Sequence, residues 1–115
     1  MGLIRPSDGI ADEPQSGLRR LTLVHQATGA GALTMRVVTV DPGVATRLHW
    51  HKIEEAMMLL EGEGRAVLGD DVMDIKAGET LLGPARLRHG FINTGSTPMK
   101  LVVAFPAVEV ETFFD

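Results

Sequence analysis

The sequence predicts an all-β fold with essentially no helix. Three observations support this prediction. Apolar residues do not follow the 3.6-residue period of an amphipathic helix over any sustained stretch. The 13 glycines and 6 prolines fall at short intervals along the 115 residues. Between them lie short runs rich in valine, leucine and threonine, and many such runs separated by turns are typical of a β-sandwich or barrel.

Ten of these runs are each expected to form a strand, because β-branched and other apolar residues gather between turn residues. The run with sequence EAMMLL could pass for a helix, but six residues between turns are too few. The expected strands cover residues 20–25, 32–40, 45–51, 55–60, 64–68, 71–75, 79–83, 88–93, 99–105 and 108–114.

Turn residues separate the expected strands. Asp41-Pro42-Gly43 fits a type II turn, because proline favours the first central position and glycine accepts the positive φ of the second. Gly69-Asp70 fits a two-residue hairpin turn with glycine first. Residues 93–96, with sequence NTGS, carry another turn signal.

The N-terminal residues differ in composition from the rest of the chain. Residues 1–17 hold three acidic residues, two prolines and three glycines, so we expect an arm outside the core. Residues 18–115 are then expected to form a single domain. The arm lacks the basic, apolar and small-residue layout of a signal peptide, and a cytoplasmic location is expected.

Composition excludes several classes of function. The absence of cysteine excludes disulfides, thiolate zinc sites and a cysteine nucleophile, so any metal must be held by nitrogen and oxygen ligands. The longest apolar run, at 101–108, falls far short of the roughly 20 residues of a membrane span, and no membrane association is expected. A net charge of −4, with basic pairs at 19–20 and 86/88, offers no basic face for nucleic acid.

Two histidines one residue apart, in the stretch LHWHKIEEAM, raise the question of a metal site. On a strand, His49 and His51 point to one face and Trp50 to the other. Glu54 and Glu55 have opposite parities, so one of the two can reach the histidines.

A third imidazole is available from His89, in the run RHGFIN. Three imidazoles and one carboxylate suit iron, manganese, nickel, copper or zinc. A histidine on a strand is otherwise most often a polar residue with a hydrogen-bond partner. We assign that role to His25, since nothing near it completes a site. The spacing alone leaves both interpretations open for the histidine pair.

Residues 43–62 read G-x5-H-x-H-x3-E-x6-G, with every spacing of the first motif of the cupin family. Residues 78–93 resemble the second motif, G-x5-P-x-G-x2-H-x3-N, with one departure: Arg86 stands where the motif has its second glycine. The matched residues are Gly43, His49, His51, Glu55, Gly62, Gly78, Pro84, His89 and Asn93. The chain therefore resembles a small single-domain cupin of the RmlC-like superfamily, type 2.

The resemblance implies a jelly-roll-like β-barrel that holds one divalent transition metal near its mouth. It assigns His49, His51, Glu55 and His89 as metal ligands, and it turns Glu54 outward. The expected metal is iron, manganese, nickel, copper or zinc.

Strand alternation extends the prediction to a pocket around the metal. Arg47, Met57 and Phe91 share faces with the expected ligands and are expected to contact substrate. Arg47, nearer the rim, suits a carboxylate clamp, or it is an arginine of the barrel edge. Leu59 and Leu87 are expected in the core.

Arg86 is expected to need a different backbone from the glycine of the motif, or to extend its side chain across the mouth. Across the mouth it would favour an anionic substrate. We favour the alternative of a surface residue beside Arg88.

The resemblance and the composition together imply a function. We expect a metal-dependent enzyme, a dioxygenase or an isomerase or lyase, acting on a small oxygen-rich or carboxylate-bearing substrate. The alternative is a non-catalytic metal-binding or ligand-binding cupin. Because Phe113 and Phe114 are adjacent in an apolar tail, their side chains point to opposite faces, and a homodimer is expected to cover the surplus apolar surface.

Overall fold

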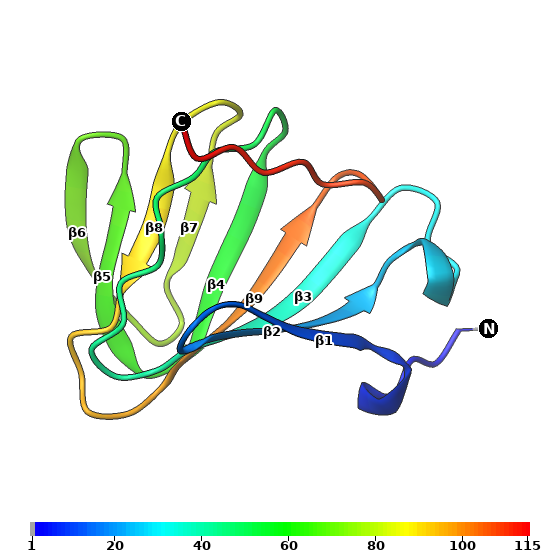
Figure 1. Cartoon of the computed structure of the whole chain (residues 1–115), viewed down its shortest axis with the longest axis horizontal. Helices are drawn as coiled ribbons and strands as arrows, with labels where there is room; N and C mark the ends of the chain where they lie inside the picture. The colour runs from blue at the N-terminus through cyan, green and yellow to red at the C-terminus, as the bar shows by residue number, and fades with distance from the viewer. Residues whose placement is uncertain (1) are drawn as a thin grey trace.

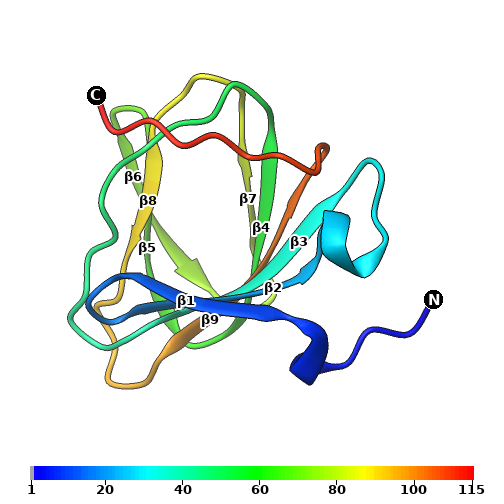
Figure 2. The same cartoon turned by 45° about the vertical axis from the view of Figure 1, so that its right-hand side comes forward.

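The computed structural model describes residues 2–115. The chain folds into two antiparallel sheets that face each other, as Figures 1 and 2 show. The larger sheet has the strand order β1-β2-β3-β9-β4-β7, and the smaller one has the order β6-β5-β8. This arrangement confirms the prediction of an all-β, jelly-roll-like fold.

The strand bounds agree closely with the sequence prediction over most of the chain. The larger sheet contains β1 (Ile10–Gln15), β2 (Leu18–Val24), β3 (Thr34–Val40), β4 (Glu55–Glu61), β7 (Thr80–Gly83) and β9 (Met99–Phe105). The smaller sheet contains β5 (Glu63–Leu68), β6 (Asp71–Lys76) and β8 (His89–Ile92). The helical residues described are two 3-10 turns, η1 (Pro6–Asp8) and η2 (Gln26–Thr28). Within residues 2–115, no helix has the length and apolar character needed to span a membrane.

The core lies between the two sheets and is built by alternate residues of each strand, because side chains of a strand alternate between its faces. On β4, Met57 and Leu59 point inward and are almost completely buried. They pair with Val103 and Leu101 of β9, which are buried as well. Glu55 follows the same alternation at the start of β4, so the strand that builds the core also carries a carboxylate into the interior.

Two of the three predicted turns are present. Gly43 has a φ of 80°, and the N–H of Val44 donates to the carbonyl of Asp41 over 3.1 Å, as a type II turn requires. Gly69 has a φ of 60° in the hairpin between β5 and β6. These glycines accept a backbone conformation that costs most other residues energy.

The prediction of a regular strand at residues 45–51 is wrong. The segment runs beside β8 and meets it at single bridges, from Ala45 to Ile92 and from His49 to His89. Between these bridges the hydroxyl of Thr46 accepts a hydrogen bond from the N–H of Phe91 over 2.8 Å. A side chain thereby takes the place of the backbone acceptor that a continuous ladder would need.

Both ends of the chain also differ from the expected strand pattern. The strand expected at 108–114 is wrong, since the tail meets the rest of the chain at one bridge, from Phe113 to Trp50. Within the expected arm, Ile10–Gln15 form β1, which pairs with β2 at the edge of the larger sheet. Its register shifts between Asp12 and Gln15, around Pro14, which lacks the N–H that a ladder needs.

Candidate metal centre

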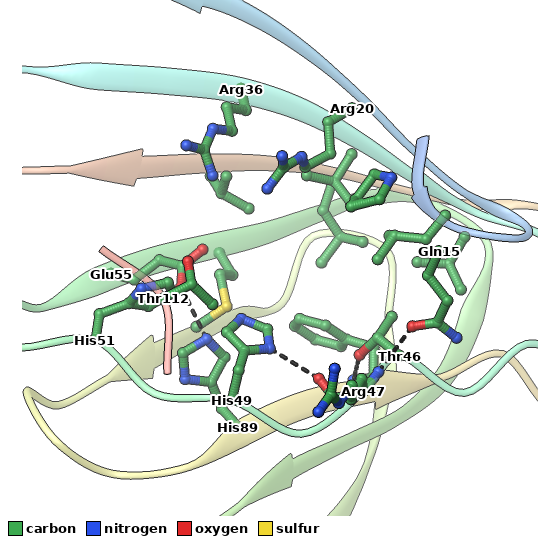
Figure 3. Close-up of a pocket in the computed structure, with 18 of the residues that line it drawn as sticks. Gln15, Arg20, Arg36, Thr46, Arg47, His49, His51, Glu55, His89 and Thr112 are labelled. Carbon is green, nitrogen blue, oxygen red and sulfur yellow. Dashed lines mark hydrogen bonds and ion pairs between the residues drawn. The ribbon is translucent and has the colours of Figure 1, made fainter. Parts of the chain in front are cut away.

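The structure brings His49, His51, Glu55 and His89 together, and one potential ligand atom from each lies within 4.8 Å of all the others. The Oε1 atom of Glu55 is 2.8 Å from Nε2 of His89 and 3.2 Å from Nε2 of His51. Figure 3 shows the four side chains gathered on one wall of a pocket. The sequence therefore predicted which four side chains meet; that they hold a metal stays a prediction.

Backbone pairing places the imidazoles side by side. His49 and His89 exchange main-chain hydrogen bonds of 3.2 and 2.8 Å, and their ring centroids lie 4.5 Å apart. Glu55 pairs with Gly83 of β7. A Cβ at Gly83 would approach Cε of Met57 to 3.0 Å and Nδ1 of His89 to 3.4 Å. The glycine thus leaves room for the ring of His89.

Each of the three imidazoles turns its Nδ1 toward a backbone carbonyl oxygen. A carbonyl can only accept a hydrogen bond, so the proton of each neutral imidazole belongs on Nδ1, and Nε2 keeps a free lone pair. The Nδ1-to-oxygen distances are 2.8 Å from His49 to Arg47, 2.7 Å from His51 to Glu111 and 3.4 Å from His89 to Leu87.

This orientation leaves unsatisfied acceptors at the centre of the cluster. The Nε2 atoms of His51 and His89 and the Oε1 atom of Glu55 are buried and have no hydrogen-bond partner, despite their short separations. Lone pairs then face lone pairs, an arrangement that costs energy unless a cation sits between them. Three imidazole nitrogens and one carboxylate oxygen fit a divalent transition metal.

The protonation states suit metal binding. Burial alone would raise the pKa of Glu55, but when the rings of His51 and His89 are protonated, their hydrogen bonds and positive charge outweigh burial and lower that pKa to about 2. Burial lowers the pKa of His49, and the carbonyl of Arg47 opposes this shift. Near neutral pH, Glu55 is therefore a carboxylate and His49 a neutral imidazole, the forms that ligate metals.

The cluster opens onto a cavity of about 550 Å³ between the sheets. Its apolar walls come mainly from the inward faces of β2, β3, β4, β8 and β9, and the lining apolar side chains include Leu18, Val38, Val40, Met57, Phe91, Leu101, Val103, Phe105 and Phe114. The predicted contact residues Arg47, Met57 and Phe91 all line this cavity, and their contact with a substrate stays a prediction.

The two leucines that we expected in the core behave differently. Leu59 is buried in the core. Leu87, expected there too, is instead 37% exposed, because it precedes β8 in a turn where strand alternation does not apply.

Sequence reasoning missed several residues of the cavity. Arg20 of β2 and Arg36 of β3 line it from the larger sheet, and Gln15 of β1 and Thr112 of the tail line it from its edges. Arg36 shares the inward face of β3 with Val38 and Val40. Alternation along this strand could have found it, but Met35 and Val37 on the outward face are apolar as well, so the pattern did not distinguish the two faces.

The C-terminal tail packs against the segment that carries His49 and His51. Trp50 and Phe113 stack with ring centroids 4.4 Å apart and exchange main-chain hydrogen bonds of 2.9 and 3.0 Å. The indole N–H of Trp50 donates to the carbonyl of Asp115 over 3.1 Å. Figure 2 shows the tail crossing above the space between the sheets. The tail therefore forms part of the rim of the cavity.

Arg86 adopts the left-handed backbone conformation that favours glycine. Its φ is 70°, close to the 80°, 89° and 93° of the motif glycines Gly43, Gly62 and Gly78. The expectation of a different backbone from that of the motif glycine stays a prediction. The side chain is exposed and does not line the cavity, as expected for the surface alternative.

Two further residues occupy the places that the sequence suggested. Nδ1 of His25 accepts a hydrogen bond from the N–H of Ala27 and caps η2. Glu54 is exposed, whereas its neighbour Glu55 is buried. Neither His25 nor Glu54 belongs to the cluster of potential ligands.

The chain is similar in sequence to known proteins over most of its length. The family model described as a cupin domain matches residues 36–105. Protein SchB of Streptomyces halstedii is 33% identical over 84 residues, which make up 72% of this chain and 61% of that protein. The chain spans between 51% and 61% of the length of the curated relatives that it matches.

Solved structures share the fold at low sequence identity. The polyketide cyclase RemF from Streptomyces resistomycificus superposes with a TM-score of 0.85 at 22% identity, over 99% of this chain and 84% of that one. The oxalate decarboxylase of Bacillus subtilis, studied for its Mn(II) centres, superposes with a TM-score of 0.83 at 19% identity. That match covers 96% of this chain and 31% of the decarboxylase.

Proposed function

The chain belongs to the cupin domain family, and from this premise we propose that it is a metal-dependent enzyme. His49, His51, Glu55 and His89 would hold one divalent transition metal. The observation that carries this proposal is the position of the four donors on the wall of a cavity of about 550 Å³. Because three donors are neutral and one is a carboxylate, a divalent ion would keep a net positive charge and room for a substrate oxygen.

The bound metal would supply Lewis-acid or redox chemistry to a coordinated substrate. Manganese is one candidate, because the structurally similar oxalate decarboxylase has Mn(II) centres. Iron, nickel, copper and zinc suit the same donor set.

The residues around the cluster would position a small substrate. The apolar walls at Met57 and Phe91 would exclude water from the reacting end, and the rim residue Arg47 would contact a polar group at the mouth. We propose a dioxygenase, isomerase or lyase reaction on a small oxygen-rich or carboxylate-bearing substrate. The likeness to the polyketide cyclase RemF supports the isomerase or lyase class.

Metal analysis tests the proposal most directly. The full chain is purified without chelators and without a metal-affinity resin, and its metal content is measured by mass spectrometry. About one equivalent of a transition metal per chain is expected. A chain that stays free of metal, and that takes up none of the five candidate ions at micromolar concentration, would contradict the proposal.

One observation favours the second candidate, a non-catalytic binding cupin. Among the described residues that line the cavity, those outside the ligand cluster include no aspartate, glutamate, lysine or further histidine. The chain also lacks tyrosine and cysteine, so it has few groups for proton transfer at neutral pH. Recovery of a tightly bound ligand unchanged after long incubation with oxygen would favour this alternative, whereas its turnover would favour the enzyme.

We also propose a homodimer. The outward faces of β4 and β7 expose Met58, Leu60 and Leu82 by 39%, 41% and 56%, and a second copy of the chain would cover them. Sedimentation at micromolar concentration that gives a single species of 12.4 kDa would contradict the dimer. The cytoplasmic location and the absence of nucleic-acid and membrane partners stay predictions.

A further inference from the structure

Arg36 points from β3 into the cavity, on the wall that faces the cluster of potential ligands (Figure 3). Its guanidinium carbon lies 5.2 Å from the centre of the Phe105 ring. The same ring lies 5.0 Å from the ring of His51. The two distances together place the guanidinium at most about 10 Å from the His51 ring. A small molecule can therefore reach both.

Among the described residues, Arg36 has no hydrogen-bond or ion-pair partner for its side chain. Its Nε atom is buried without a hydrogen bond, and within residues 2–115 the guanidinium forms no ion pair. Burial lowers the pKa of Arg36, and the nearby charge of Arg20 adds to the effect, whereas the carboxylates of Glu55 and Asp12 oppose it without forming an ion pair with Arg36. A half-buried cation without an anion costs stability. The folded chain thus holds inside the cavity a positive charge that forms no ion pair.

Arg20, its neighbour on the same face of the sheet, is already paired. Its Nε and Nη2 atoms donate to the two carboxylate oxygens of Asp12 over 2.9 and 2.5 Å. Arg47, which we expected to clamp a carboxylate, lies exposed at the rim, with its guanidinium over the ring of Phe114 at 4.1 Å. Of the three cavity arginines, Arg36 is therefore the one best placed to form an ion pair with an anionic ligand.

We propose that Arg36 binds a carboxylate of the substrate, and that the substrate is an apolar monocarboxylic acid with an oxygen donor at its other end. The inference rests on the proposed function, since that second oxygen would reach the metal. A guanidinium matches a carboxylate with two parallel hydrogen bonds. One free arginine balances a single negative charge, so a monocarboxylate fits this wall better than a doubly charged phosphate. The apolar side chains that line the cavity, such as Val38 and Val103, fit a hydrocarbon body.

A pair of bifunctional probes tests the inference. Adipic acid monohydroxamate carries a metal-binding hydroxamate at one end and a carboxylate at the other, and its ω-amide replaces the carboxylate with a neutral group of similar shape. Binding of each probe to the full chain loaded with Zn²⁺ is measured by calorimetry. The carboxylate probe is expected to bind about tenfold more tightly than the amide, as a charge-assisted hydrogen bond provides.

Variants of the chain test whether Arg36 causes the preference for the carboxylate probe. In Arg36→Met the preference for the carboxylate is expected to vanish. In Arg36→Lys it should shrink, because lysine keeps the charge but lacks the two parallel N–H donors of a guanidinium. Arg65→Met, at an exposed arginine of β5 outside the cavity, should leave the preference unchanged. Thermal unfolding of each variant confirms that it is folded, and the comparison of the two probes on the unmodified chain does not depend on any variant.

The outcomes separate the inference from the proposed function. Equal binding of the two probes to the unmodified chain, or a preference that survives in Arg36→Met, overturns the role of Arg36 and leaves the metal site in place. Failure of both hydroxamates to bind the zinc-loaded chain contradicts the proposed metal site itself, and the inference then falls with it.

Discussion

The Nδ1 atom of His51 lies 2.7 Å from the carbonyl oxygen of Glu111, 60 residues later in the chain. This contact gives the C-terminal tail a role in the candidate centre, because it sets which nitrogen of His51 carries the proton. The bridge between Trp50 and Phe113 holds the tail in this position.

Deletion of residues 111–115 should weaken metal binding. Without the carbonyl of Glu111, the His51 ring loses its fixed tautomer and orientation, and losses of this kind are typically about 10- to 100-fold in metal affinity. Competition with a chromogenic chelator measures the change. Because the contact uses the main chain, Glu111→Ala is the matched control and should retain full affinity. A truncated chain that binds metal as tightly as the full chain would show that the tail does not orient His51.

Substitutions of the two adjacent glutamates should have opposite outcomes. Glu55→Gln should weaken metal binding, because the buried carboxylate would become a neutral amide. Glu54→Gln is the matched control and should leave the metal content unchanged, since Glu54 is exposed. His51→Ala should remove most of the metal and leave the chain folded, because the core is made by apolar residues of the strands. Metal content by mass spectrometry and circular dichroism together check these outcomes, and the reverse result for the two glutamates would contradict the strand register.

Acidification should release the metal as the pH falls through about 6, because a protonated imidazole cannot ligate. Dialysis at a series of pH values, followed by metal analysis, measures this release. Metal that stays bound at pH 4 would contradict a centre made of three imidazoles.

The metal-free chain should also lose stability on acidification. Burial depresses the pKa of His49 below its usual 6.5. On acidification the unfolded chain therefore binds a proton at His49 at a higher pH than the folded chain does, and the free energy of unfolding falls as the pH drops below 6.5. The pKa of Glu55 is lowered from 4.5 to about 2, so its contribution is complete above 4.5 and is lost as the pH falls toward 2. Urea unfolding at several pH values measures both losses. The first should shrink in His49→Gln, and an unchanged profile in that variant would argue against the burial effect.

Replacing Arg86 with glycine should not destabilise the chain. The left-handed backbone at Arg86 costs an arginine about 1 kcal/mol or more, and glycine avoids this cost while losing more conformational entropy on folding. The free energy of unfolding should therefore stay constant or rise by up to about 1 kcal/mol. Arg88→Gly, at a position without positive φ, is the control and should lose about 0.5–1 kcal/mol. Equal losses in the two variants, measured by urea unfolding, would contradict the strain at Arg86.

Strand alternation explains why much of the fold and the grouping of the four side chains could be predicted. On β4, Glu55 shares parity with the buried Met57 and Leu59, so the apolar pattern that specified the strand also turned this carboxylate inward. The spacing of His49 and His51 placed them on one face even though their segment is not a regular strand.

Other features depend on contacts that the local pattern does not contain. β1 holds acidic residues and Pro14. It forms a strand at the sheet edge because its partner β2 pairs with its backbone. The tail resembled a strand, but contacts with Trp50 and His51, far away in the sequence, decide its path. Arg36 was missed because its isolation becomes visible only when its neighbours are known.

The order of the four donors along the chain has a consequence for folding. His49, His51 and Glu55 lie within seven residues, whereas His89 follows after β7. An unfolded chain keeps the first three donors close at little entropic cost, so it would retain affinity for the proposed metal. Affinity of the unfolded chain would reduce the stabilisation that a bound metal provides to the native state. His89 is the donor that folding adds, and the thermodynamic coupling between metal binding and folding would therefore depend chiefly on this one histidine.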